Sequence, residues 1–479
     1  MTRKWLIAIP AILLQFFIFK HFYPYASFFQ DSYSYIYAAM EHDVIGYRPI
    51  GYSWFLRLIH AISASDTFLV FIQYCLLQGA GLYLYFSVVR LFSPRKSIQH
   101  LLFFFLLFDP LLLYLANVVS SDALFIALSL IWLTTLLWLV RRPSVRHLLL
   151  QLFLLILIFY TRYNALCYPV IAAAAVLLTR KGAVFKLTGI VSSVLVLVFG
   201  VLIVREATRQ QTGVKIFSAF SAWQIANNAL FMYPYIQVDP SRLPSAECRE
   251  LDSFVRATPA HQPVDTWYMW DPQSPLKKYM QMRQKKEHTG YFTAWNKVAP
   301  VYSEYGYYLT TRHPWLFTRE YLWPSARIFF YPDLEMLMRY NEGESKVDQT
   351  AKDWFHYGST QVRIACSPDL QGRLLGPFPA FYLAINLAFV LGAVWYWIQG
   401  KGSAGSAGFR DALLNKSGFR EALLMTMTFF AVNAAFCIFA TPNMFRYQVA
   451  PMIWLFVFTL LTYDRLFSRW IPGPAARKG

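Results

Sequence analysis

Five charged residues lie beside long apolar runs, where a charge is costly unless it is paired or functional. Asp31 and Arg48 occur in the polar segment after the first run. Asp122, Arg162 and Arg446 occur in short turns between later runs. A carboxylate can take a proton from a hydroxyl group, and an arginine can hold a phosphate through parallel N–H donors. The residue types therefore predict one site that combines a base with an anion-binding group.

Each of these residues also has a structural interpretation. Asp31 and Asp122 stand near the starts of predicted helices, where aspartate often caps the first turn. Arg162 could extend toward the lipid head groups, and Arg446 could anchor its helix at the membrane surface. Capping and anchoring therefore stay open beside catalysis and phosphate binding. Tyr163, directly after Arg162, is included among the predicted substrate-binding residues.

The composition excludes an ordinary soluble enzyme. The 479 residues are 57% hydrophobic and 15% charged, against roughly 25% charged in a typical soluble domain. The apolar runs can cross about 30 Å of hydrocarbon, which takes roughly 20 residues of helix. We therefore predict an all-α polytopic membrane protein with about ten transmembrane helices. The expected spans are Trp5–Phe22, Thr67–Phe92, Ile98–Asn117, Asp122–Val140, Leu148–Tyr160, Ala165–Leu178, Leu187–Val204, Pro377–Gly400, Ala422–Ala440 and Phe445–Tyr463.

The basic residues predict the orientation. With the amino terminus inside, the inner segments hold 18 Lys and Arg residues but only Asp411, Glu421 and Asp464 as acids. Short loops rich in Lys and Arg stay on the cytoplasmic side, so both termini are predicted to be cytoplasmic. The outer segment 206–376 holds 19 basic and 17 acidic residues. The net charge of +18 therefore reflects the excess of Lys and Arg in the inner segments and does not indicate a nucleic-acid partner.

The predicted spans divide the chain into four parts. Residues 1–205 form a transmembrane catalytic module whose first outer loop covers about 23–65. Residues 206–376 form a mixed or mostly helical extracytoplasmic domain that is dense in aromatic residues. The last transmembrane helices occupy 377–463, and a cytoplasmic tail occupies 464–479.

The first outer loop has the pattern of two short amphipathic helices along the membrane interface. Asp31 starts the first helix, and Arg48 directly precedes the second, in which Pro49 suits the first turn. The apolar positions at helical spacing are Tyr33, Ile36, Tyr37 and Met40 in the first helix, and Phe55, Leu58, Ile59 and Ile62 in the second.

Two of the five cysteines, Cys248 and Cys366, lie in the outer segment. An oxidising compartment would permit a disulfide between them. Two unpaired thiols are the equal alternative, because the sequence does not give the distance between the Cα atoms. No CxxC motif or His/Cys cluster indicates a zinc site.

Several motifs occur in a characteristic order along the chain. They are Asp31 in its interfacial helix, YRPIGYSWFL, PLLLYLANVVSSDALFIALSL, TRYNALCYP and FRYQVAP. In this order they resemble the membrane glycosyltransferases of the C superfamily, and come closest to the bacterial lipid A aminoarabinose transferase and the protein mannosyltransferases. The resemblance covers the first 205 residues well and the last 60 weakly, and YYLTTRHPWLFTREYLWP adds to it in the outer segment.

The resemblance implies a donor that carries a sugar on a polyprenyl phosphate and a transfer at the outer face of the plasma (inner) membrane. Asp31 matches the catalytic aspartate of the family, and Arg48, Asp122 and Arg162 match its charged positions. Protein mannosyltransferases carry adjacent Asp and Glu residues, whereas Asp31 is followed by Ser32. A divalent cation at this position therefore lacks a second local carboxylate, and the metal requirement is unknown.

Glycosyl transfer from a lipid phosphate needs a base for the acceptor hydroxyl and positive charge for the departing phosphate. We predict Asp31 as the base and Arg48, Arg162 and Arg446 as the phosphate-binding groups, in a single displacement that inverts the anomeric centre. Asp122 is predicted as a substrate-binding residue that orients either the acceptor or a phosphate-binding arginine. The acceptor is a lipid, a glycan or a protein. The alternative functions are a transporter or flippase for lipids or lipid-linked glycans, and a polysaccharide polymerase or ligase.

Overall fold

The computed structural model describes most of the chain. The described residues are 2–258, 265, 267–401, 418–440 and 443–467. Within them the secondary structure is helical, and β pairing is limited to three isolated bridges. The predicted tail 464–479 begins inside the last described helix, and its residues 468–479 lie outside the described part.

The chain forms two compact units. Unit 1 contains Met1–Leu197, Phe330–Asn433 and Met444–Gly479, and unit 2 contains Val198–Phe329 and Ala434–Asn443.

This division differs from the expected continuous domain 206–376, because the structure assigns residues 330–376 to unit 1. Hydrogen bonds to the first loop account for the difference. Tyr340 donates its hydroxyl hydrogen to the carbonyl of Ala26, and the backbone N–H of Ala365 donates to the carbonyl of Phe22.

Eight described helices are long and apolar enough to cross a membrane. They are Lys4–Phe22, Asp66–Phe92, Lys96–Asn117, Ser121–Arg141, Ala183–Thr212, Leu370–Gln399, Phe419–Phe439 and Phe445–Phe467. The shorter apolar helices Val145–Thr161 and Tyr163–Leu177 occupy the two remaining predicted positions. The chain is therefore an all-α, multi-pass membrane protein.

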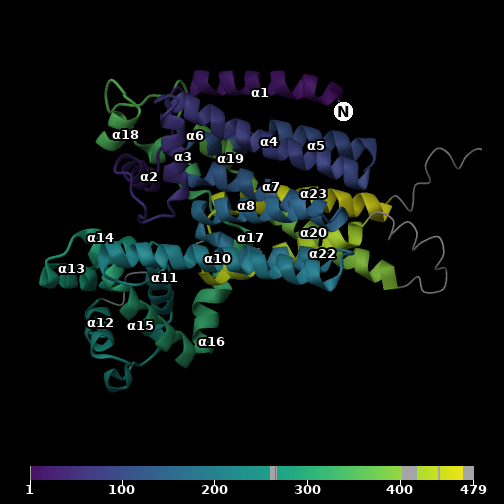
Figure 1. Ribbon diagram of the computed structural model, residues 1–479. Helices are drawn as coiled ribbons and strands as arrows, with labels where there is room; N and C mark the ends of the chain where they lie inside the picture. The colour runs from purple at the N-terminus through teal and green to yellow at the C-terminus, as the bar shows by residue number, and fades with distance from the viewer. Residues whose placement is uncertain (1, 259–264, 266, 402–417, 441–442, 468–479) are drawn as a thin grey trace, which may run out of the picture. The chain divides into compact units, whose positions relative to one another are not determined.

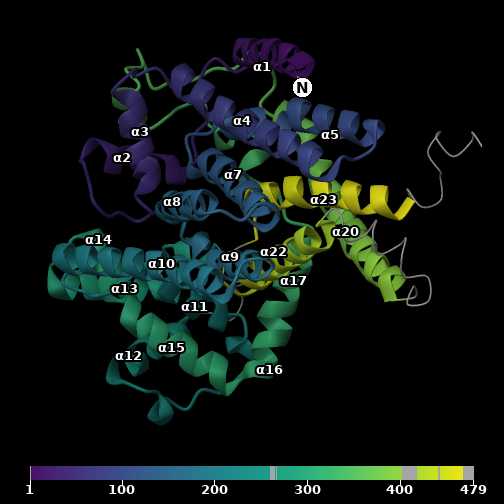
Figure 2. The same ribbon diagram turned by 45° about the vertical axis from the view of Figure 1, so that its right-hand side comes forward.

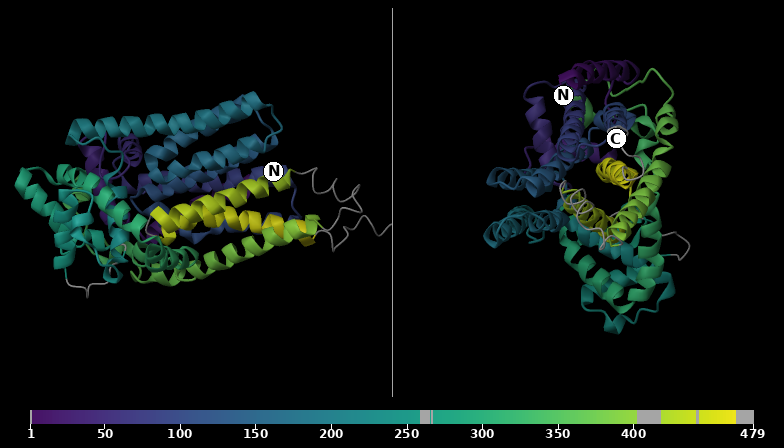
Figure 3. Two further views of the ribbon diagram at one scale, coloured as in Figure 1. Left: turned by 90° about the horizontal axis from the view of Figure 1, so that it is seen from below. Right: turned by 90° about the vertical axis from the view of Figure 1, so that its right-hand side faces the viewer.

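In unit 1, helix α7 packs against α4, α8, α9 and α23, and α20 packs along α23 (Figures 1 and 2). The unit contains α1 (Thr2–Phe22), α2 (Gln30–Met40), α3 (Gly51–His60), α4 (Asp66–Phe92), α5 (Lys96–Phe108), α6 (Pro110–Asn117), α7 (Ser121–Arg141), α8 (Val145–Thr161), η1 (Tyr163–Cys167), α9 (Tyr168–Leu177), η6 (Glu335–Leu337), η7 (Tyr340–Gly343), α18 (Gln349–Trp354), α19 (Leu370–Leu375), α20 (Phe378–Lys401), η8 (Phe445–Gln448) and α23 (Val449–Phe467). Helices α10 (Ala183–Thr212), α17 (Trp323–Phe330) and α22 (Phe419–Ala440) extend from one unit into the other. The yellow-green α20 and the yellow α23 run alongside each other in Figure 3.

The third span is interrupted at Asp109. Helix α5 ends at Phe108, and α6 begins at Pro110, which has no N–H to leave unpaired at the first helical position. The carboxylate of Asp109 accepts a hydrogen bond of 3.0 Å from the backbone N–H of Leu111. Asp109 is therefore the N-cap of α6.

The first loop contains the two predicted short helices, α2 and α3. Tyr37 is exposed on α2 and Leu58 on α3, whereas Ile36 and Ile59 are buried, so each predicted apolar stripe is divided between the interior and the outside. The division arises because α2 packs against both α3 and α18.

Helix α3 begins at Gly51, with Ile50 as its N-cap. The expectation that Pro49 forms part of the first helical turn is therefore wrong. Gly51 is the residue that lies close to α8, because a Cβ atom there would come within 2.6 Å of the carbonyl carbon of Tyr160.

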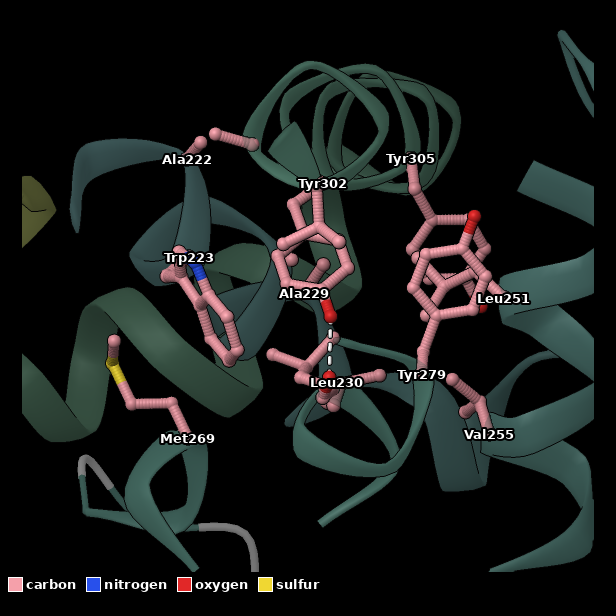
Figure 4. Packing of buried hydrophobic residues seen from close by; sticks show 14 of the residues in the cluster. Ala222, Trp223, Ala229, Leu230, Leu251, Val255, Met269, Tyr279, Tyr302 and Tyr305 are labelled. Carbon is pink, nitrogen blue, oxygen red and sulfur yellow. Dashed lines mark hydrogen bonds between the residues drawn. The ribbon is translucent and has the colours of Figure 1, made fainter. Parts of the chain in front are cut away.

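Unit 2 has a core of packed aromatic side chains between α11 and α15. Its elements are α11 (Ala219–Leu230), η2 (Tyr233–Tyr235), η3 (Pro240–Arg242), α12 (Ala246–Ala257), η4 (Tyr268–Trp270), α13 (Pro275–Glu287), α14 (Tyr291–Lys297), α15 (Ala299–Arg312), α16 (Pro314–Phe317) and the π-helical turn η5 (Thr318–Leu322). Figure 4 shows Trp223 beside Tyr302, and their ring centres are 4.7 Å apart. Gly306 lets the backbones of α15 and α11 approach, because a Cβ there would meet Ile225 at 2.7 Å.

The buried Lys277 points its ammonium group at this aromatic core. The nitrogen lies 5.0 Å from the ring centre of Trp223, 5.1 Å from that of Trp270 and 4.8 Å from that of Trp295. Burial lowers the pKa of Lys277 to about 8. The ring faces act in the opposite direction, because they stabilise the charged ammonium.

The cysteines are free thiols, so Cys248 and Cys366 are not bridged. The thiol of Cys248 donates to the carboxylate of Glu304 at 3.4 Å, and burial raises the pKa of this thiol to about 11.

A Gly51→Ala substitution is expected to lower the stability of the protein. The added methyl group has no room beside the backbone of Tyr160, and overpacking of this kind costs about 1–3 kcal/mol. Gly79→Ala is the matched control, because the corresponding Cβ in α4 meets nothing within 4 Å. Thermal unfolding in detergent gives the melting temperatures of both variants. Equal melting temperatures for the two would contradict a tight contact between α3 and α8.

Candidate functional site

Asp31 and Arg48 form the part of the site that comes from the first loop. Asp31 is the second residue of α2, and its Oδ1 accepts a hydrogen bond of 2.5 Å from Nη2 of Arg48. Asp31 does not cap the helix, because Phe29 is the N-cap and its N–H donates to the hydroxyl of Ser32. The carboxylate of Asp31 is therefore available for the arginine.

Asp122 and Arg162 form a second ion pair in unit 1, between Asp122 Oδ1 and Nη1 of the arginine. Ser120 is the N-cap of α7, and its hydroxyl also donates to Oδ2 of Asp122 at 2.8 Å. Asp122, like Asp31, is the second residue of its helix and not its cap. Arg162 stands between α8 and η1 and is largely buried, so it does not extend to the lipid head groups.

Arg446 joins the two ion pairs. It lies in η8, where its Nη1 is 3.1 Å from Asp122 Oδ2 and its Nη2 is 3.4 Å from Asp31 Oδ2. The side chain of Arg446 is 4% exposed, which excludes a role as a surface anchor. The five predicted charges therefore form one continuous chain in the order Arg48, Asp31, Arg446, Asp122 and Arg162.

The chain of ion pairs contains three guanidinium groups and two carboxylates, so positive charge is in excess by one. Asp122 is 1% exposed and Asp31 is 13% exposed. An excess buried charge is costly unless a counter-charge approaches it. In addition, Nε of Arg446 is buried and has no hydrogen-bond partner among the residues that the structure describes. These features suit the binding of an anion.

Hydrogen bonds outside the ion pairs hold the site in position. The segment before α2 runs parallel to the segment before α7, where the N–H of Ser27 donates to the carbonyl of Asn117 at 2.8 Å. The amide of Asn341 accepts a hydrogen bond of 3.1 Å from the N–H of Phe28. A further backbone bond, from the N–H of Phe445 to the carbonyl of Asp333, fixes the turn that carries Arg446.

Two opposing effects set the pKa of Asp31. Burial disfavours the carboxylate and raises the pKa, whereas the positive charges of Arg48 and Arg446 lower it. The charges prevail, so the pKa of Asp31 lies below its usual value. Asp31 is therefore ionised at neutral pH, as a general base must be.

The structure adds two residues that the sequence interpretation missed. The ring of Tyr447 covers the guanidinium of Arg162 at 4.2 Å, and its hydroxyl accepts a hydrogen bond of 3.0 Å from Arg446. Glu342 lies at the exposed edge of the site, where burial and the charge of Asp31 raise its pKa. The position of Tyr447 next to Arg446 was a signal for the first. No signal identified Glu342, because it is one of many acids in a long polar segment.

Tyr163 has a different environment from the five charges. It directly follows Arg162, and its ring packs against Phe159 with 5.3 Å between the ring centres. The aromatic face over Arg162 comes instead from Tyr447.

A metal ion at Asp31 would meet a carboxylate that two arginines already contact. Arg446 already contacts Asp31, so a cation would compete with it. Within the described part of the chain, no three His, Cys, Asp or Glu side chains form a group that could hold a metal.

Comparison with protein-family models, with curated proteins and with solved structures gives no match to this chain.

Replacing Asp122 by Asn is expected to destabilise unit 1 strongly. The substitution leaves Arg162 and Arg446 buried without their shared carboxylate, and breaking a buried pair in this way costs about 3–5 kcal/mol. Asp239→Asn is the matched control, because Asp239 pairs with Arg242 on the surface and should have little effect. Chemical denaturation in detergent measures the free energy of unfolding of both variants. A small effect for Asp122→Asn would contradict the compact, buried arrangement.

Proposed function

We propose that this protein is an integral membrane glycosyltransferase of the C superfamily that moves a sugar from a polyprenyl-phosphate donor to an acceptor hydroxyl. The observation that carries the proposal is the position of Asp31 between Arg48 and Arg446. A buried carboxylate beside an excess of arginine combines the two functions that this reaction needs, a base and a phosphate-binding group.

The reaction follows from these charges. The phosphate of the donor enters the positively charged site and is bound by the arginines as charge-assisted donors. Arg48 and Arg446 then interact with the phosphate as well as with Asp31. They stabilise the carboxylate of Asp31 less than before, so its pKa rises and it becomes a stronger base. Asp31 takes the proton of the acceptor hydroxyl as its oxygen attacks the anomeric carbon. The bond from that carbon to the phosphate oxygen breaks, and its electron pair stays on the phosphate.

A single displacement of this kind inverts the anomeric configuration. Asp122 holds Arg162 and Arg446 in position and does not contact the reacting atoms itself. Glu342, at the exposed edge, offsets part of the charge of Arg446 when the site holds no donor. Tyr163 extends the binding surface next to Arg162.

The membrane arrangement that accompanies this function has ten spans, both termini in the cytoplasm and the segment 206–376 outside, in the plasma (inner) membrane. The bias of Lys and Arg toward the inner segments supports it. Helices α2 and α3 then lie at the outer interface, where exposed apolar residues such as Met40 and Leu58 contact lipid. The site therefore opens at the outer leaflet, where a lipid-linked donor and an acceptor from the cell envelope can meet.

The acceptor is a lipid, a glycan or a protein, and unit 2 selects it. Aromatic side chains remain exposed on this unit, among them Trp267 and Tyr307. The faces of such rings suit sugar binding, whereas Tyr302 and Tyr305 are buried and belong to the core.

Gently solubilised protein is expected to carry a polyprenyl phosphate, with or without a sugar, that native mass spectrometry detects as an adduct. Arg48→Ala and Arg162→Ala should lose this adduct, because each removes a phosphate-binding group. Arg57→Ala should retain it, because Arg57 lies on α3 but outside the ion-pair chain. Retention of only bulk phospholipid in all of these proteins would contradict the proposal and favour a transporter.

Asp31→Asn is expected to reduce sugar transfer by about 10²–10⁴-fold, the range for loss of a general base. The assay uses the donor lipid identified by mass spectrometry, with radiolabelled sugar and isolated membranes. Asp43→Asn, in the same loop but outside the site, should transfer sugar at the rate of the unaltered protein. The proposed mechanism fails if Asp31→Asn remains active, or if the product keeps the anomeric configuration of the donor.

A further inference from the structure

Unit 2 contains a cavity of about 510 Å³ at the end of helix α10. Its walls come from α10, from the segment that leads into α11, and from the first turns of α11 and α15. Among its lining residues are Val201, Arg205, Lys215, Ser221, Pro300 and Ser303. None of the lining residues belongs to the ion-pair chain of unit 1.

The cavity is basic. Arg205 and Lys215 line it, and none of its lining residues is acidic. The neighbouring carboxylate of Glu206 is engaged by Arg209. In the described part of the chain, neither Arg205 nor Lys215 forms an ion pair of its own. Two cations in a lining without an acidic residue favour the binding of an anion.

Hydroxyl groups and apolar side chains complete the lining. Ser221 and Ser303 supply hydroxyl donors that suit phosphate oxygens. Val201, Ile216 and Pro300 supply apolar walls. The combination suits a phosphate that is attached to an apolar group better than it suits a free phosphate ion.

The position of the cavity indicates where such a group would come from. Helix α10 exposes Phe199, Leu202 and Ile203 just before Arg205, and it is one of the helices able to cross a membrane. With a rise of about 1.5 Å per residue, Arg205 lies only about 3 Å beyond Ile203 along the helix. The cations therefore stand where the apolar surface ends, which is the level of the lipid head groups.

We propose that this cavity binds the phosphate head group of an anionic membrane phospholipid. Arg205 and Lys215 contact the phosphate, the two serine hydroxyls donate to its oxygens, and the glycerol and first acyl carbons lie against the apolar walls. The bound lipid ties α10 to the start of α11 and so holds unit 2 at the membrane surface.

The test is lipid retention by the full-length protein in detergent, measured by native mass spectrometry. The protein is mixed with phosphatidylglycerol, with phosphatidylcholine or with inorganic phosphate. The test variant is Arg205→Gln with Lys215→Gln. The control variant is Lys285→Gln with Lys286→Gln, which removes the same charge from exposed positions of α13 outside the cavity.

The unaltered protein and the control variant should retain phosphatidylglycerol in preference to phosphatidylcholine. The test variant should bind phosphatidylglycerol about 30-fold more weakly, because each lost cation contributes about five- to sixfold in affinity. Thermal unfolding without added lipid should be alike for both variants, which separates lost binding from lost folding.

Equal loss of phosphatidylglycerol in both variants would overturn the proposal, because it would indicate a general charge effect. Equal retention of the two lipids by the unaltered protein would also overturn it. If inorganic phosphate binds to the unaltered protein and phosphatidylglycerol does not, the cavity takes a free phosphate and the lipid is excluded.

Discussion

The arrangement of unit 1 depends on the cost of burying charge. Arg446 and Asp122 are almost fully buried, so each needs opposite charge beside it to stay ionised, and they contact each other directly. Arg446 contacts two carboxylates that lie on different helices, so its position requires both helices to be in place. The site places an opposite charge beside each of these buried groups. It still contains one arginine more than it has carboxylates.

Backbone contacts around the site achieve this positioning. Ser27 pairs with the segment at Val118, which brings the start of α2 near the start of α7. Asn341 adopts a left-handed backbone conformation with φ of 50° and binds the same loop from the other side. Gly51 allows α3 to approach α8. Residues without charge therefore determine where the charged residues meet, and the aromatic core of unit 2 forms separately from them.

The sequence identified the helices and the charged residues but not their pairing. Long apolar runs predict spans directly, because their length must match the bilayer. Asp31 and Arg446 stood out because charges are rare beside such runs. Their contact is set by tertiary packing across 415 residues of chain, which local patterns do not record. Pro49 was misplaced for the same reason, since the start of α3 depends on the close approach to α8. Glu342 lies in a polar segment where no residue stands out.

The place of Arg446 along the chain has a consequence for biosynthesis. A ribosome adds this arginine only after the residues of helices α1 to α22. Until then, Asp31 and Asp122 are matched one to one by Arg48 and Arg162, and the nascent chain has no spare positive charge at this position. The last span brings that charge into the bilayer. A truncated chain that lacks this span would therefore insert the earlier helices yet have no site able to attract an anion.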